Sequence, residues 1–204
     1  MKKIYALAFI LAAVVAVTAA VRTNCETGPA ADAKAAVAIG SVVADFTLPD
    51  ADGKEHTLAS LKGTKGTVIL FIATKCPVSN AYNGRMQKLA DDYASRGVNV
   101  VGINSNVAEL APEVKQHAAD KGLKFKILKD ADNAIADRFD AQVTPEAYLL
   151  DASGKLVYHG RIDNSRAGDS ITSTELRDAI DAVLSGKAVG KTEAKAFGCS
   201  IKRG

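Results

Sequence analysis

An apolar run followed by a cysteine and a proline is the feature that most constrains the fold of this chain. The run, Val68–Ala73, is rich in β-branched and aromatic residues, which is the pattern of a strand buried on both faces. Cys76 and Pro77 follow it. Proline is favoured at the first position of a helix because its missing N–H would be unpaired there anyway. The sequence therefore predicts a buried strand, a short turn and a helix that begins at Pro77.

Cys76 stands where that helix begins. A thiol in this place faces the free N–H groups and the positive end of the helix dipole, and both favour the thiolate. The neighbouring cation of Lys75 acts in the same direction. The alternative is a buried structural cysteine, because free cysteines are among the most buried residues. We interpret Cys76 as a reactive thiol, acidic and accessible to solvent.

The first residues are typical of a targeting segment. A basic start and an apolar run over Ile4–Val17 are followed by small residues suited to cleavage. The run is short for a membrane span and Arg22 follows closely, which favours export with removal over anchoring. We predict a signal peptide over residues 1–20, a flexible Ala-rich leader over residues 21–36, no stable membrane insertion after cleavage, and a location in the periplasm, the cell envelope or outside the cell.

Composition excludes several classes of function. With 204 residues, 48% apolar and 24% charged, the chain has the composition of a globular domain. The formal net charge of +3 falls to +1 once Lys2 and Lys3 are removed, which leaves no electrostatic footprint for nucleic acid. The histidines are scattered and no Cys/His cluster is present, so we expect neither a metal nor another cofactor.

The rest of the chain alternates between strand and helix patterns. The order of elements predicts one α/β domain over residues 37–186, with a mixed β-sheet flanked by helices, followed by a polar tail over residues 187–204. A Gly-containing turn between the last two strands indicates a hairpin. The expected strands are Ile39–Leu48, Val68–Ala73, Val98–Ile103, Phe125–Leu128, Val143–Leu150 and Lys155–His159, and the expected helices are Pro77–Ser95, Pro112–Lys121, Asn133–Phe139 and Thr174–Leu184.

Three cysteines are present, Cys25, Cys76 and Cys199, and no two have CxxC spacing. In an exported protein, this odd number allows one disulfide and one leftover thiol. Cys199 is therefore either one half of a disulfide or the leftover thiol.

Four segments together resemble the thioredoxin fold and, within it, the peroxiredoxin-like group related to alkyl hydroperoxide reductase and thiol-specific antioxidant proteins. The resemblance covers roughly Val37 to Leu184. The segments are similar to the family's entry strand and turn, its nucleophile turn, its cis-proline loop and the hairpin beyond it. They are Asp45–Leu48 with Asp52–Lys54, Phe71–Pro77, Val143–Pro145 and Leu149–Lys155.

Two departures shape what the resemblance implies. Ser79 stands where thioredoxins carry their second cysteine, and its hydroxyl can hydrogen-bond a thiolate but cannot close a disulfide. Ala73 stands where typical peroxiredoxins carry Thr or Ser, which departs from the standard peroxidase site. The segment Ala196–Lys202 resembles the C-terminal cysteine segment of a subgroup of the family. This implies that Cys199 resolves a sulfenate or mixed disulfide on Cys76. The alternatives are a structural disulfide between Cys199 and Cys25 and an unpaired tail cysteine.

The resemblance also implies a substrate groove. Pro145 would be cis and lie opposite Cys76, and the backbone of Thr144 would pair with an extended substrate strand. Arg161 either stabilises the thiolate or a leaving hydroxide, or is simply solvated. The polar segment Asn104–Asn106 ends a central strand on its carboxyl side, where ligands bind in open α/β sheets, or forms a plain polar turn.

The resulting hypothesis is an exported thiol oxidoreductase and antioxidant. Its Cys76 thiolate reduces peroxides or protein disulfides, and a thioredoxin-like reductant restores it. The alternative is a non-catalytic thioredoxin-fold module that holds an extended peptide in the Pro145 groove by strand addition.

Overall fold

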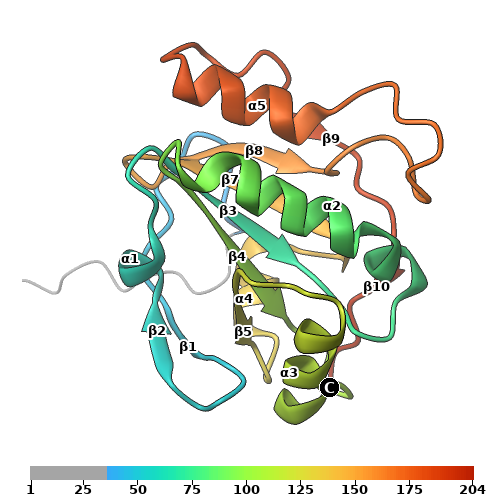
Figure 1. Cartoon of the computed structure of the whole chain (residues 1–204). Coiled ribbons are helices and arrows are strands. Elements are labelled where there is room, and N and C mark those ends of the chain that lie inside the picture. The colour runs from blue at the N-terminus through green and yellow to red at the C-terminus, as the bar shows by residue number, and fades with distance from the viewer. Residues whose placement is uncertain (1–35) are drawn as a thin grey trace, which may run out of the picture. The chain divides into compact units, whose positions relative to one another are not determined.

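The computed structural model describes residues 36–204, which form a six-stranded mixed sheet with helices on its faces and two small two-stranded sheets (Figure 1). The predicted signal peptide and all but the last residue of the predicted leader lie outside the described residues. The elements are β1 (Thr47–Pro49), β2 (Glu55–Thr57), α1 (Leu58–Leu61), β3 (Gly66–Phe71), α2 (Pro77–Ala94), β4 (Val98–Asn104), α3 (Ala111–Asp120), β5 (Lys126–Lys129), α4 (Ala134–Phe139), β6 (Val143–Thr144), β7 (Glu146–Asp151), β8 (Leu156–Gly160), α5 (Glu175–Leu184), β9 (Glu193–Ala194) and β10 (Cys199–Ser200).

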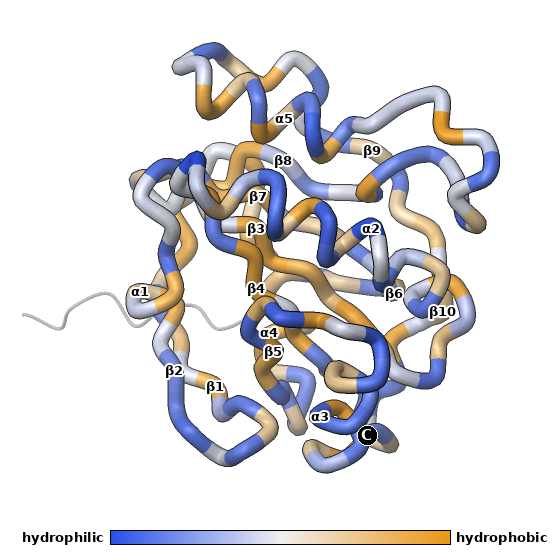
Figure 2. The backbone as a smooth tube through the Cα atoms, viewed as in Figure 1, coloured by the Kyte–Doolittle hydropathy of each residue, from blue (hydrophilic) through white to orange (hydrophobic). Residues whose placement is uncertain are grey.

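The main sheet has the order β5-β4-β3-β7-β8-β9. Its central strand β3 pairs in parallel with β4 and antiparallel with β7, and all six of its residues are buried. Figure 2 shows this centre as the most continuous hydrophobic part of the tube. The predicted mixed sheet flanked by helices is thus confirmed, because a strand covered on both faces must be apolar throughout.

Two hydrophobic cores cover the two faces of the sheet. The first, here called the α2-side core, is built from side chains of α2, α3 and α5, including Met86, Leu89 and Ile180. The second, the α4-side core, is built from α1, α4 and the chain before β1, including Phe46 and Phe139. The sheet is thereby held rigidly, and the carboxyl ends of β3 and β4 are left to carry the polar groups described below.

One expected strand is wrong. The chain from Ile39 to Phe46 is irregular apart from an isolated bridge at Val42, and only Thr47–Pro49 forms a strand there. Its apolar side chains are buried without regular pairing, because Val43 and Phe46 pack into the α4-side core. The weak hydrophobic alternation of this segment therefore indicates buried side chains and not a strand.

The tail is more ordered than its polar composition indicates. β9 pairs in parallel with β8, and β10 pairs antiparallel with β6, the two-residue strand just before Pro145. Ile201 is 5% exposed and belongs to the α4-side core. In Figure 1 the tail passes the start of α2. Residues 187–204 thus add strands to the domain beyond the predicted boundary at residue 186.

Among residues 36–204, the structure contains no helix that is both long and apolar enough to cross a membrane.

Candidate active site

Cys76 caps the N-terminus of α2. Its backbone is extended, Pro77 occupies the first turn as predicted, and the Ser79 N–H donates a hydrogen bond of 3.3 Å to the Cys76 Sγ. The Ser79 hydroxyl plays a different part from the predicted one. Its Oγ accepts a hydrogen bond of 3.1 Å from the Ala73 N–H and thereby closes the turn between β3 and α2. Ser79 therefore serves the sulfur through its backbone.

The loop before β7 forms the opposite wall of the site. The Thr144–Pro145 peptide bond is cis, as the resemblance implied, and the Cys76 thiol donates a hydrogen bond of 3.3 Å to the Thr144 carbonyl oxygen. The Thr144 hydroxyl is buried and has no hydrogen-bond partner among the described residues. The predicted opposition of Cys76 and the Pro145 loop is thus present in the structure.

The tail brings Cys199 into this site. β10 places Cys199 directly opposite Thr144, in the position where an extended substrate strand was expected to pair. Cys76 is only 3% exposed, whereas Cys199 is half-buried. The prediction that Cys76 is open to solvent is therefore wrong, because the segment carrying Cys199 adjoins it. Both cysteines are free thiols in the structure.

The two thiols differ in acidity. Burial raises the pKa of Cys76, but hydrogen bonding from the Cys199 thiol and the Ser79 N–H outweighs it, so the pKa lies below that of an ordinary cysteine. Hydrogen bonding to Cys76 raises the pKa of Cys199, and burial adds to that effect. The site thus favours a thiolate on Cys76 and a thiol on Cys199.

Replacing Cys199 with alanine is expected to raise the pKa of Cys76, because the thiolate loses the hydrogen bond from the Cys199 thiol. Thiolate absorbance in the ultraviolet, recorded against pH in a Cys25→Ser background, measures this shift. Cys199→Ser is the matched control, because its hydroxyl keeps a donor at that place. Identical titration of Cys76 in the alanine variant and the parent would contradict the assignment of Cys199 as the donor.

Lys75 does not supply the charge that we expected from it. Its side chain is 59% exposed, and its Nζ donates to Glu113, 3.1 Å away, and to the Ala108 carbonyl oxygen. The ammonium group is therefore engaged by a carboxylate on α3. The lowered pKa of Cys76 has its causes in the hydrogen-bond donors around the sulfur, and not in Lys75.

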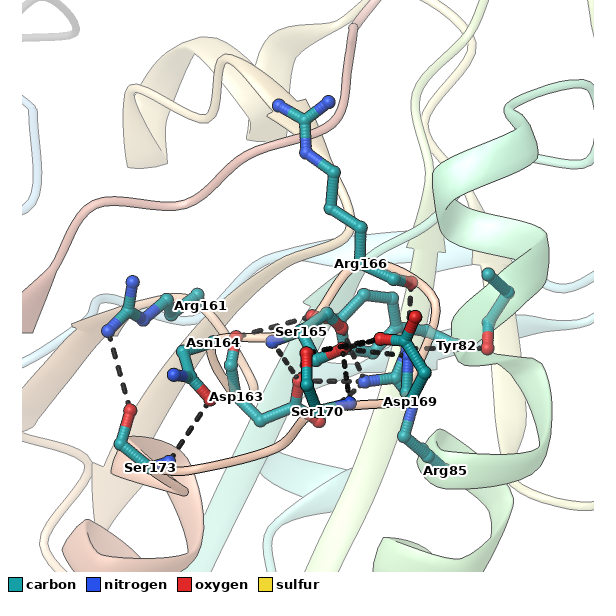
Figure 3. Close-up of polar contacts among 12 residues, drawn as sticks. Tyr82, Arg85, Arg161, Asp163, Asn164, Ser165, Arg166, Asp169, Ser170 and Ser173 are labelled. Carbon is teal, nitrogen blue, oxygen red and sulfur yellow. Dashed lines mark hydrogen bonds and ion pairs between the residues drawn. The ribbon is translucent and has the colours of Figure 1, made fainter.

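The structure does not bring Arg161 to the sulfur. Its Nε donates to the Glu175 carboxylate at 3.1 Å, and its guanidinium also reaches Ser173. Figure 3 shows Arg161 directed toward Ser173, apart from the cluster around Asp163. Among the described residues, no hydrogen bond or ion pair joins Arg161 to Cys76. Arg161 holds the loop after β8 to the start of α5.

That loop supports the tail. The buried Asp163 carboxylate accepts hydrogen bonds from Arg85, at 2.7 Å, and from the Tyr82 hydroxyl, at 2.9 Å, which ties the loop to α2 (Figure 3). Phe197, two residues before Cys199, packs against the Tyr82 ring and lies under the Arg166 guanidinium. Sequence reasoning missed these supports, although Phe197 lies in the segment that carried the resemblance.

A cavity of about 230 Å³ adjoins both cysteines. Its lining includes Cys76, Cys199, Asn106 and Glu109, together with Lys75 and Lys202. A small molecule therefore has a site next to both sulfurs while the tail is in place.

Comparison with known proteins identifies the family of this chain. Residues 39–159 match the AhpC/TSA family. The thiol-disulfide oxidoreductase ResA of Geobacillus thermodenitrificans is 32% identical over 123 residues, which is 60% of this chain and 69% of that protein.

Solved structures give the same fold. A hypothetical protein of Sinorhizobium meliloti has a TM-score of 0.77 and 39% identity, over 83% of this chain and 97% of its own. Peroxidoxin BcpB of Mycobacterium tuberculosis has a TM-score of 0.59 at 22% identity, over 72% of this chain and 96% of its own, and it supports the thioredoxin-like fold alone. The chain therefore belongs to the AhpC/TSA family, and it is a thiol oxidoreductase.

Proposed function

We propose that the protein is an exported thiol–disulfide oxidoreductase that cycles between the Cys76/Cys199 dithiol and a Cys76–Cys199 disulfide. The observation that carries the proposal is the pairing of β10 with β6. It sets Cys199 opposite Thr144, whose carbonyl oxygen accepts the Cys76 S–H. The acidic Cys76 thiol and the Cys199 thiol therefore both adjoin the backbone of Thr144. Ser79 stands where thioredoxins carry their second cysteine, and in this proposal Cys199 of the tail takes the part of that cysteine.

The reducing cycle follows from thiol chemistry. The Cys76 thiolate attacks one sulfur of a substrate disulfide, and the other substrate sulfur leaves as a thiolate that takes the proton of Cys199. The Cys199 thiolate then attacks the Cys76 sulfur of the mixed disulfide. The second substrate sulfur leaves and is protonated from solvent, so two electrons have passed to the substrate. A thioredoxin-like dithiol reduces the Cys76–Cys199 bond in turn and becomes a disulfide itself.

Several facts support disulfides as the substrate. The relative with 32% identity is named a thiol-disulfide oxidoreductase. Ala73, in the place where peroxiredoxins carry Thr or Ser, lends only its N–H to Ser79. Access requires either that a protein substrate displaces β10 from β6 or that a small disulfide enters the cavity beside the sulfurs.

Peroxide reduction is the second candidate. The AhpC/TSA match and the small cavity favour it, because a hydroperoxide fits beside Cys76 without displacing the tail. In that version the Cys76 thiolate attacks the O–O bond of hydrogen peroxide and becomes a sulfenic acid, and the hydroxide that leaves takes a proton from solvent to form water. Cys199 then condenses with the sulfenic acid, which releases a second water.

Two assays run in parallel test the proposal. Reduction of insulin disulfides with a dithiol donor should proceed well above the rate of the donor alone, and peroxide consumption shows whether the second chemistry also occurs. Mass spectrometry of the oxidised protein should then identify a Cys76–Cys199 disulfide. A Cys25–Cys199 bond with unmodified Cys76 would contradict the mechanism.

Export rests on the N-terminal sequence, whose basic start and apolar run suit a cleaved signal peptide. Expression of the full chain in a bacterium with cell fractionation tests it. A mature protein outside the cytoplasm that lacks about the first 20 residues is expected, and an uncleaved cytoplasmic product would contradict it.

A further inference from the structure

The segment after β4 carries a buried polar cluster that the mechanism above does not use. Asn104, Asn106 and Glu109 are each 5% exposed or less. The Glu109 carboxylate accepts hydrogen bonds from the Thr74 N–H at 2.8 Å and the Lys75 N–H at 2.9 Å, and from the Asn104 side chain at 2.5 Å. Glu109 therefore fixes the two residues that precede Cys76.

The same cluster also binds the tail. The Asn106 Oδ1 accepts a hydrogen bond of 2.7 Å from the Lys202 N–H, and the Val107 N–H donates one of 3.1 Å to the Lys202 carbonyl oxygen. These bonds fix the chain three residues beyond Cys199. The loop before one cysteine and the tail after the other are thus attached to neighbouring residues of one rigid turn.

Lys129 joins the two halves of this cluster. Its buried Nζ donates to the Asn104 Oδ1 at 2.9 Å and to the Asn106 carbonyl oxygen at 2.7 Å. Burial raises the pKa of Glu109, but the backbone and amide donors outweigh it, so the pKa lies below the usual range and the carboxylate is charged. Lys129 thus connects Asn106 to Asn104, whose side-chain amide donates to Glu109.

We propose that Asn106 and Glu109 are positioning residues of the redox pair. By fixing the tail and the nucleophile loop to one turn, they raise the effective concentration of Cys199 at Cys76 and so stabilise the Cys76–Cys199 disulfide. The inference rests on the proposed dithiol cycle and adds to it. It assigns the control of the reduction potential to residues that hold the chain on either side of the two cysteines.

The test compares reduction potentials in a Cys25→Ser background. Asn106→Ala removes the acceptor for the Lys202 N–H, and the fraction of Cys76–Cys199 disulfide is measured in glutathione buffers of graded ratio. We expect the disulfide's equilibrium constant to fall about tenfold, because the Lys202 N–H loses its acceptor and the tail is held less firmly beside Cys76. A tenfold change corresponds to a rise of about 30 mV in potential for this two-electron couple.

Matched variants separate positioning from folding. Asn106→Asp keeps an acceptor oxygen and should restore most of the parent potential. Glu109→Gln, which places an amide N–H among three donors, should raise the potential as Asn106→Ala does. Glu113→Gln is the control, since that exposed carboxylate bonds the Lys75 side chain and should leave the potential unchanged. Lys202→Pro removes the same tail N–H from an exposed position and serves if Asn106→Ala does not fold.

The outcomes are distinct. A parent-like potential in the Asn106 and Lys202 variants, with only a lower unfolding midpoint, overturns the positioning role and leaves the proposed function standing. A parent protein that forms no Cys76–Cys199 disulfide overturns both. A raised potential in Asn106→Ala with recovery in Asn106→Asp supports the inference.

Discussion

Replacing Cys76 with serine is expected to lower the rate of protein-disulfide reduction by about a thousandfold or more, to the level of the donor alone. A serine hydroxyl at neutral pH is not ionised and cannot form the mixed disulfide. The helix cap should survive, because a serine oxygen also accepts the Ser79 N–H hydrogen bond. The measurement is insulin reduction with a dithiol donor, together with a circular dichroism spectrum to show that the fold is intact.

Cys199→Ser and Cys25→Ser are the informative comparisons for that variant. Cys199→Ser should still form a mixed disulfide through Cys76, which mass spectrometry detects, but should turn over slowly because the resolving thiol is gone. Cys25→Ser should behave as the parent protein does. Full activity in Cys76→Ser would contradict the mechanism, and retained peptide binding without any loss of function would favour the non-catalytic binding module.

Replacing Gly198 with valine is expected to release the tail from the site. A Cβ at this position would overlap the Thr144 carbonyl oxygen and lie 2.6 Å from its carbonyl carbon, so the backbone of β10 could not stay beside β6. The effective concentration of Cys199 at Cys76 should then fall about a hundredfold. Loss of Ile201 from the α4-side core should also lower the free energy of unfolding by about 1.5–3 kcal/mol.

Alkylation of Cys76 measures this release most directly. Cys76 is almost fully buried, and its reaction with iodoacetamide should accelerate once the adjoining tail is gone. Gly190→Val is the matched control, because no atom lies within 4 Å of a Cβ placed on that tail glycine. If Cys76 is alkylated at the same rate in both variants and the parent, the docked tail does not protect it.

Much of this site could be predicted from the sequence, because its parts are local. The strand β3 is apolar throughout, and Pro77 marks the start of α2 wherever the rest of the chain goes. The cis peptide before Pro145 followed from a resemblance carried by several segments, and the structure has it. These features depend on a few neighbouring residues, so the linear pattern is sufficient to find them.

The remainder depends on contacts between distant parts of the chain. β9 and β10 are two residues each, too short for any periodicity to appear, and they exist because β8 and β6 offer unpaired edges. Arg161 pairs with Glu175 rather than with the sulfur or with solvent alone, and nothing in the sequence identifies Glu175 as its partner. Glu109 was missed, although the polar run Asn104–Asn106 indicated that the end of β4 carries functional groups.

Ile201 links the redox chemistry of the tail to the stability of the folded protein. It is buried two residues beyond Cys199, so the segment that carries the redox thiol also completes the hydrophobic interior. A Cys76–Cys199 bond would close a loop of about 120 residues and, by chain-entropy reasoning, add about 4–5 kcal/mol to the free energy of unfolding. Proteases digest unfolded chains. The reduced form, which lacks this bond and unfolds more readily, is therefore the form that is degraded faster. Without an oxidising substrate the protein would stay in its reduced form. Its turnover would then stop, and it would also be degraded faster.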